Sequence, residues 1–269
     1  MLRFLTLIVL LVTAAQWWAA GAFERRVLNK TSRLLADPPP ENREALQIPA
    51  AIRAFAERCG ASDETAPAAI RIAQRCRIRG APGEAWRPLT AEQVIGVRTS
   101  GFVWWARQSL GPMPIAKVVD ALESGRGLLE ARLFGSIPLI RATGPEIDQG
   151  EFMRYLAELP LAPDAMLHNP RLAWRQLSDE VFEVSDESAS GTSAVRLVFE
   201  QGELARCEAD SRPRLVGKES VPTAWAGRFG DYREFGGRRV PTRVEVSWIL
   251  DSGPFVYFEG EITDLELLP

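Results

Sequence analysis

Residues 148–167, DQGEFMRYLAELPLAPDAML, interrupt a chain that otherwise reads as a succession of β-strands. Apolar side chains in this stretch recur at positions i, i+3, i+4 and i+7, which is the spacing of one face of an α-helix. They are Phe152, Tyr155, Leu156 and Leu159. A sheet with one apolar face needs another element to cover it, and this helix is the best candidate in the sequence. We therefore expect a curved sheet with the helix packed in its concavity.

Both ends of this helix carry sequence signals. We expect Asp148 to act as the N-cap, with Glu151 three residues later completing a capping box. Pro160 and Pro163 should end the helix, because proline lacks a backbone donor and clashes with the preceding turn.

Residues 70–79, IRIAQRCRIR, alternate between apolar and mostly arginine positions, which is typical of a strand with one buried face. The row formed by Arg71, Arg75, Arg77 and Arg79 could bind phosphate or lipid head groups. We favour a solvated face with cross-strand ion pairs, because the chain is slightly acidic overall.

The remaining elements are mostly short strands separated by turns that contain glycine or proline. Short helices are expected at residues 49–59 and within 82–98, the second with Thr90 as N-cap and Gln93 as its partner. Further strands are expected at 101–110, 115–122, 128–134, 137–142, 172–176, 181–185, 194–200, 204–209, 222–229, 232–235, 239–250 and 255–268. Short connections pair such strands antiparallel and in sequence order. The fold class is therefore mainly β (α+β): a single curved antiparallel sheet, or half-barrel, with two or three helices covering the concave face.

Composition excludes several function classes. The formal net charge of −3 argues against a nucleic-acid partner. With one histidine, His168, and no C-x-x-C motif, neither a metal site nor a cofactor is expected. Cys76 and Cys207 lie in strands and could pair if they are close, but we favour buried free thiols for both and for Cys59.

The N-terminus predicts export. Residues 1–22 combine Arg3, an apolar core and the small residues Ala20-Gly21-Ala22, so they form a signal peptide or an N-terminal membrane anchor. Basic residues that follow would favour a cytoplasmic domain by the positive-inside rule, but we favour export to the periplasm or to an anchored position in the envelope. Residues 23–47 are expected to form a charged and proline-rich linker, and 48–269 a single β-rich domain.

Five motifs carry a resemblance to a known family. They are RPLTAEQ at 87–93, GFVWWARQSL at 101–110, GEFMRYLAELPLAPDAML at 150–167, TAWAGRFGDYREFGGRRVPTRVEVSW at 223–248 and GPFVYFEGEI at 253–262. In order and spacing the chain resembles an uncharacterised bacterial family of unknown function, DUF6544, over about residues 48–268. Its layout is also similar to the half-barrel of LolA/LolB-like lipoprotein carriers. The first resemblance implies no activity, and function does not follow from a fold.

Aromatic residues recur along successive strands, and in a half-barrel their inward-facing members would line one trough beside the helix. The candidates for lining a cavity are Phe102, Trp104, Trp105, Phe152, Tyr155, Leu156, Trp174, Trp225, Trp248 and Tyr257. Such a trough could bind a hydrophobic ligand, or it could be a plain core that the helix fills.

The leading hypothesis is an exported, non-catalytic protein that binds a lipid or other hydrophobic small molecule. One alternative is an envelope scaffold for protein interactions with a filled core. The other is a hydrolase that uses carboxylates from among Glu130, Glu146, Asp148 and Glu151. We favour capping for the last two and an exposed strand face for Glu130, because capping explains their spacing.

Overall fold

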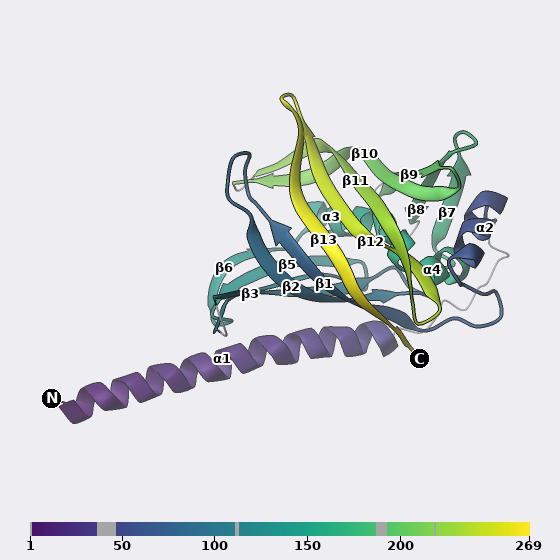
Figure 1. Cartoon of the computed structure of the whole chain (residues 1–269). Helices are drawn as coiled ribbons and strands as arrows, with labels where there is room; N and C mark the ends of the chain where they lie inside the picture. The colour runs from purple at the N-terminus through teal and green to yellow at the C-terminus, as the bar shows by residue number, and fades with distance from the viewer. Residues whose placement is uncertain (1, 37–46, 111–112, 187–192, 218) are drawn as a thin grey trace.

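The computed structural model of the chain describes residues 2–36, 47–110, 113–186, 193–217 and 219–269. Within them, thirteen strands form one antiparallel sheet in the order β6-β5-β4-β3-β2-β1-β13-β12-β11-β10-β9-β8-β7. The strands are β1 Ala69–Ile78, β2 Arg87–Gly96, β3 Phe102–Leu110, β4 Met113–Glu123, β5 Arg126–Leu133, β6 Ile137–Ala142, β7 Leu172–Gln176, β8 Val181–Asp186, β9 Ala194–Glu200, β10 Glu203–Val216, β11 Glu219–Phe235, β12 Arg238–Leu250 and β13 Gly253–Leu268. The sheet curls into a half-barrel (Figure 1), so the predicted fold class is confirmed.

The order of the strands explains how a simple meander forms so large a sheet. The first strand, β1, pairs along its whole length with the last strand, β13, from Ala69 opposite Leu268 to Ile78 opposite Phe258. Each half of the sheet then follows the chain strand by strand outward to an edge, β6 on one side and β7 on the other. Within each half, neighbouring strands are consecutive in the chain, and α3 lies on the connection between the two edge strands, β6 and β7.

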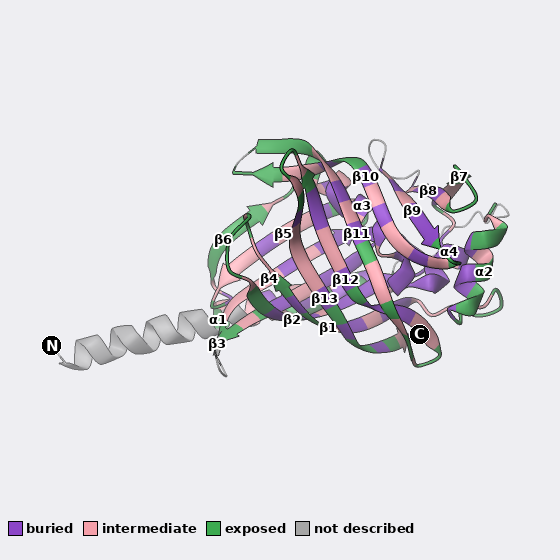
Figure 2. Ribbon diagram, turned by 45° about the horizontal axis from the view of Figure 1, so that its top comes forward, coloured by how far each residue is buried: buried purple, intermediate pink, exposed green. Residues whose placement is uncertain are grey.

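The predicted central helix lies in the concavity of this sheet (Figures 1 and 2). It is α3, Pro145–Ala157, and a short 3-10 turn, η1 Leu159–Leu161, follows it. The predicted apolar stripe, Phe152, Tyr155, Leu156 and Leu159, is fully buried in the main core. The helix therefore covers the sheet as its spacing predicts.

The prediction that Asp148 caps this helix is wrong. The helix begins at Pro145 with Gly144 as N-cap, so Asp148 is inside the first turn. Its carboxylate accepts a hydrogen bond from the backbone N–H of Gly127 at 2.7 Å, and Arg126 donates to it at 3.3 Å. This buried hydrogen bond from a strand amide to the Asp148 carboxylate attaches the helix to β5. It constrains the position of the helix more strongly than a local cap would.

The prediction of a helix starting at Thr90 is also wrong. Residues 87–96 form β2, which pairs with β1 on one side and β3 on the other. A capping signal of two residues is local, whereas a strand between two partners gains backbone hydrogen bonds along both edges. Gln93, the expected capping partner, instead has a fully buried side chain that faces the concavity network described below.

The N-terminal helix α1, Leu2–Ala36, runs along the convex face of the sheet (Figure 1). Phe23, Val27 and Leu34 are buried there against a second apolar cluster that includes Val103 and Val119. Residues 23–36 of the expected linker are helical, and residues 37–46 lie outside the described part of the chain. Of the helices that the structure describes, none combines the length and apolarity needed to span a membrane.

Ion pairs add to the apolar contact between α1 and the sheet. Lys30 contacts Glu123 at 2.7 Å, and Arg26 contacts Glu130 at 3.2 Å. Glu130 is 3% exposed and also pairs with Arg132. The prediction of an exposed Glu130 is therefore wrong, because α1 covers the face on which it lies.

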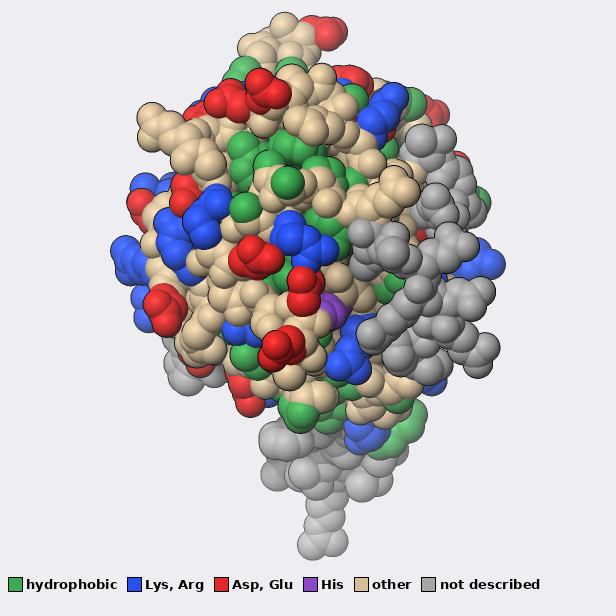
Figure 3. Space-filling model, turned by 90° about the vertical axis from the view of Figure 1, so that its right-hand side faces the viewer, with side chains coloured by type: hydrophobic (Ala, Val, Ile, Leu, Met, Phe, Trp, Pro, Cys, Tyr) green, Lys and Arg blue, Asp and Glu red, His purple; other side chains and the backbone are tan. Residues whose placement is uncertain are grey.

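Two short helices close the end of the half-barrel that faces the viewer in Figure 3: α2, Ala50–Arg58, and α4, Pro163–His168. Acidic and basic side chains are interspersed on that end (Figure 3). Inside it, Arg238 forms a two-pronged ion pair with the fully buried Asp164 at 2.8 and 2.9 Å. His168 contacts the carbonyl oxygen of Ser62 at 2.6 Å, which is a structural contact.

On the convex face, the arginine row of β1 forms ion pairs with β13. Arg71 pairs with Glu266 at 3.3 Å and Arg77 pairs with Glu259. The preferred interpretation of this row as a solvated face with cross-strand ion pairs is thus confirmed for these two arginines. Arg79 lies over the Trp86 ring at 4.4 Å and donates to the carbonyl oxygen of Val256.

Candidate functional site

Helix α3 fills only part of the hollow of the sheet. A cavity of about 470 Å³ remains between one side of α3 and the inner faces of strands from both halves of the sheet. This volume lies within the range of small-molecule sites in proteins, about 300–1,000 Å³. The cavity is therefore the candidate functional site.

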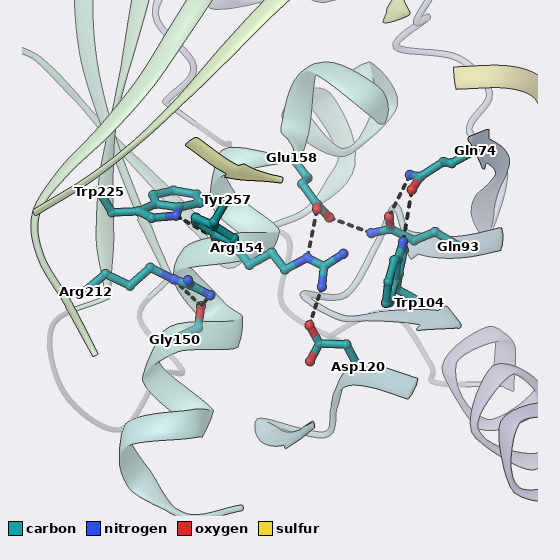
Figure 4. A network of polar contacts seen from close by, with 10 residues as sticks. All are labelled: Gln74, Gln93, Trp104, Asp120, Gly150, Arg154, Glu158, Arg212, Trp225 and Tyr257. Atoms are coloured by element: carbon teal, nitrogen blue, oxygen red, sulfur yellow. Dashed lines mark hydrogen bonds and ion pairs between the residues drawn. The ribbon is translucent and has the colours of Figure 1, made fainter. Parts of the chain in front are cut away.

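Most of the cavity wall is apolar. The aromatic and aliphatic side chains that line it include Trp104, Val118, Leu129, Leu161, Trp225, Phe229, Val244, Val246, Trp248, Phe255, Tyr257, Phe258 and Ile262. Trp248 stacks on Tyr257 with ring centroids 5.5 Å apart, and the Trp225 indole N–H donates to the Tyr257 hydroxyl oxygen at 3.0 Å. These contacts hold three large rings in fixed positions along one side of the cavity, and Figure 4 shows two of them, Trp225 and Tyr257.

A charged side chain from α3 enters this apolar space. Arg154 donates from Nε to Glu158 at 2.8 Å and from Nη1 to Asp120 on β4 (Figure 4). Its guanidinium lies over the rings of Phe102 and Trp104, 4.7 and 5.3 Å from their centroids. Burial disfavours the charged guanidinium, but the Glu158 and Asp120 carboxylates outweigh burial and raise the pKa of Arg154. Arg154 therefore stays charged inside the half-barrel.

A chain of hydrogen bonds fixes the acid that holds Arg154. Gln93 donates to the second oxygen of Glu158, Gln74 donates to Gln93 at 3.3 Å, and the Trp104 indole donates to Gln74 at 3.0 Å (Figure 4). The two glutamines come from neighbouring strands, β1 and β2. Each side chain in this series forms a hydrogen bond with the next, and this makes the polar network rigid.

A second buried guanidinium lines the same cavity and comes from the sheet. Arg212 on β10 donates twice to the carbonyl oxygen of Gly150, at 3.0 and 3.2 Å (Figure 4). It also lies over the Trp225 and Trp248 rings, at 4.9 and 5.5 Å. In the described part of the chain no carboxylate forms an ion pair with Arg212.

Two carboxyl groups in the cavity keep an oxygen without a hydrogen-bond partner among the described residues: Oε2 of Glu151 and Oδ1 of Asp120. Burial raises the pKa of Glu151 well above its usual value, and the neighbouring Asp120 raises it further. Burial also raises the pKa of Asp120 more than Arg154 lowers it.

Four of the ten residues predicted to line a cavity do so, and the structure brings them together from β3, β11, β12 and β13. They are Trp104, Trp225, Trp248 and Tyr257. Their contact with a ligand stays a prediction.

The other six predicted residues lie outside the cavity wall for identifiable reasons. Trp105 follows Trp104 on the same strand, so it points to the convex face, where it packs near α1. Phe152 and Leu156 are on the core side of α3, and Phe102 lies beneath the Arg154 guanidinium. Trp174 packs against the main core from the short strand β7.

Tyr155 is the sixth residue that lies outside the cavity wall, and its hydroxyl forms structural hydrogen bonds. It donates to the carbonyl oxygen of Gly96 at 3.0 Å and accepts from Asn169 at 2.9 Å. Burial raises the pKa of this phenol above its usual value.

The polar residues of the cavity, among them Arg154, Asp120 and Arg212, were not predicted from the sequence. One signal was available for α3: Glu151, Arg154 and Glu158 recur at i, i+3 and i+7, a polar stripe on a helix expected to be surrounded by sheet. A polar stripe on an enclosed helix has to face other polar groups or a cavity. No comparable signal marks Arg212, because its burial follows from the curl of the sheet.

Of the four acidic residues proposed for a hydrolase, only Glu146 and Glu151 line the cavity. Glu130 faces α1, Asp148 anchors α3 to β5, Glu146 is exposed at the cavity wall, and only Glu151 is buried in the cavity. Among the described residues no group of three histidine, cysteine or acidic side chains could hold a metal ion. The three cysteines are free and buried, and burial raises the pKa of Cys76 and Cys207 to about 12.

Residues 39–260 match the sequence model of a protein family described as "Family of unknown function (DUF6544)". The chain belongs to this family. No curated protein matches the sequence of this DUF6544 member. Family membership therefore implies no activity, and the proposal about function rests on the cavity.

Solved structures with a similar chain path come from several bacteria. A LolA superfamily protein from Nitrosomonas europaea is 14% identical, with 81% of this chain and 94% of that chain covered and a TM-score of 0.42. A domain assigned to outer membrane lipoprotein sorting from Vibrio parahaemolyticus is 10% identical, with 80% and 90% covered and a TM-score of 0.46. A DUF1329 family protein from Desulfovibrio piger is 11% identical, with 83% and 94% covered and a TM-score of 0.46. These distant likenesses identify no ligand.

Proposed function

We propose that this DUF6544 protein binds a lipid or other hydrophobic molecule in the cavity beside α3. The observation that carries the proposal is the open volume of about 470 Å³, which α3 leaves unfilled and which aromatic and aliphatic side chains enclose. Burying apolar surface of a ligand against such a wall is favourable by about 0.8 kcal/mol per methylene group. The same open volume argues against the alternative of a scaffold with a filled core.

The polar groups of the cavity favour a ligand with two different ends. An apolar chain fits against Trp225, Trp248 and the neighbouring aliphatic side chains, whereas Arg212 and the carboxyl of Glu151 offer a donor and an acceptor to a polar end. A few placed polar groups in an otherwise apolar pocket orient a ligand. The proposed ligand is therefore an amphipathic molecule with at least one long apolar part.

We further propose that the protein acts outside the cytoplasm, with residues 1–22 as signal peptide or anchor. The support is the sequence of the segment: one basic residue, an apolar run and the small residues at 20–22. Fusing the full chain to a reporter enzyme that is active only after export tests this location. A reporter that stays inactive contradicts it.

Native mass spectrometry of the purified full chain, incubated with a lipid extract, tests ligand binding. Leu129→Trp places a large ring in the cavity wall, and Leu177→Trp makes the same change at a position that is 44% exposed. We expect a lipid adduct on the wild type and on Leu177→Trp, and its loss from Leu129→Trp. An adduct that persists on Leu129→Trp would place the lipid elsewhere, for instance on residues 1–22, and no adduct on the wild type would refute the proposal.

A further inference from the structure

Exposed apolar side chains are concentrated on two hairpins. Eleven large hydrophobic side chains are exposed among the described residues, and seven of them lie on the β5–β6 and β10–β11 hairpins. The seven are Phe134, Ile137, Leu139, Ile140, Leu215, Val216 and Val221, and together they are called the apolar rim here. Clusters of exposed apolar side chains mark interaction sites on proteins in solution.

The apolar rim lies at one end of the molecule. In Figure 1 both hairpins are on the side from which the first half of α1 projects beyond the sheet. Trp18 on that helix is 73% exposed, and tryptophan is enriched at membrane interfaces. Leu215 belongs to the rim and also lines the cavity, as do its neighbours Pro213 and Arg214. The rim therefore borders an opening of the cavity.

The backbone at the rim is poorly suited to pairing with another strand. Strand β6 is an edge of the sheet, but Pro138 in its middle lacks a donor, and the register shifts between Ala131 and Arg132 opposite it. On the other hairpin, Pro213 and Pro222 face each other. Proline and irregular register at an edge prevent strand addition, so the rim offers side chains, not backbone groups, to a partner.

The charges at the rim indicate what such a partner is. Arg141 on β6 is exposed, and Arg214 on β10 is half-buried with its guanidinium over the Trp248 ring. Arginines beside apolar side chains match the anionic head groups and acyl chains of a bilayer surface. We propose that the apolar rim docks on a lipid bilayer, so that the cavity opens toward the membrane. Docking is distinct from ligand binding in the cavity, and each can fail without the other.

Site-specific fluorescence on the full chain tests the docking. Leu139→Cys introduces an exposed thiol in the rim, and Leu177→Cys introduces one at a matched exposed leucine, 56% and 44% exposed in the native chain. The native thiols are buried, so an environment-sensitive maleimide dye labels the introduced cysteine. With vesicles of phosphatidylcholine and phosphatidylglycerol, we expect a blue shift and quenching by lipids with brominated acyl chains at position 139 and not at 177.

Several outcomes would overturn the docking proposal. If the chain attaches to vesicles only through residues 1–22, both dyes remain in water and their emission is the same. If the rim is an interface with a second copy, the dye at position 139 shifts without vesicles and increasingly so with protein concentration. The cavity variant Leu129→Trp should keep the response at position 139, which separates failure of docking from failure of ligand binding.

Discussion

The most demanding test of the buried network is to remove the charge of Arg154 and keep its volume. Methionine retains an unbranched stem over Phe102 and Trp104, so Arg154→Met removes the guanidinium and little of the packing. The carboxylates of Asp120 and Glu158, whose side chains are 14% and 18% exposed, then lose their cationic partner.

The expected size of the effect follows from that burial. An ion pair in water contributes about 0–1 kcal/mol, whereas removal of one partner of a buried pair costs about 3–5 kcal/mol. All three side chains are less than one-fifth exposed, so the larger figure applies. For a chain of this length it corresponds to a fall in Tm of roughly 10 °C.

Urea unfolding at pH 7, followed by circular dichroism, measures the free energy of unfolding of Arg154→Met. Arg71→Met is the matched control, because its ion pair with Glu266 is 42% and 59% exposed and its loss should change stability by about 0.5 kcal/mol or less. The penalty of Arg154→Met should shrink as the pH falls, because Asp120, whose pKa is raised by burial, then takes up a proton. Adding Asp120→Asn and Glu158→Gln should restore part of the stability. Equal losses for Arg154→Met and Arg71→Met would refute the reasoning.

Three further predictions concern buried groups. Burial raises the folded pKa of Glu151 above its unfolded value, so the contribution of Glu151 to stability is full below the unfolded pKa and is lost as the pH rises through the folded pKa. Glu151→Gln cannot ionise, so in urea titrations it should gain stability relative to the wild type as the pH rises. If the stabilities of the two proteins depend on pH in parallel, this prediction is contradicted. Cys76 and Cys207, with pKa values near 12, should resist a thiol reagent at pH 8 until the chain is unfolded, and rapid reaction in the native state would contradict their burial. Gly127→Ala should lower the free energy of unfolding by about 1–3 kcal/mol, because the added Cβ would lie 2.7 Å from the carbonyl oxygen of Ile147. An unchanged urea midpoint would show instead that α3 can move away from β5.

Periodicity predicted the architecture well, for a physical reason. Burial of one face is indicated by the alternation along β1 and by the i, i+3, i+4 spacing of Phe152, Tyr155 and Leu156. The fold is stabilised by burying these faces against each other. Local capping signals were less reliable. Thr90 and Asp148 matched the pattern, but strand pairing in one case and a contact with the Gly127 amide in the other decided the structure.

The cavity was only partly predictable. Alternation distinguishes Trp104 from Trp105 once the inward face of β3 is known, but the sequence does not show which face is inward. The polar stripe of α3 was visible, yet its partners Asp120 and Arg212 come from strands 34 and 58 residues away in sequence. Only the curl of the sheet brings them to the same space, and the packing that produces this curl cannot be deduced from spacing along the chain.

The central claim is that the hollow beside α3 holds a hydrophobic ligand, and crystals of the full chain grown with a bromine-labelled fatty acid or phospholipid test it most directly. Anomalous scattering locates the bromine without assumptions about the rest of the molecule. The account predicts bromine between α3 and the rings of Trp225 and Trp248. Bromine found only outside the half-barrel, with the cavity holding water alone, would contradict it.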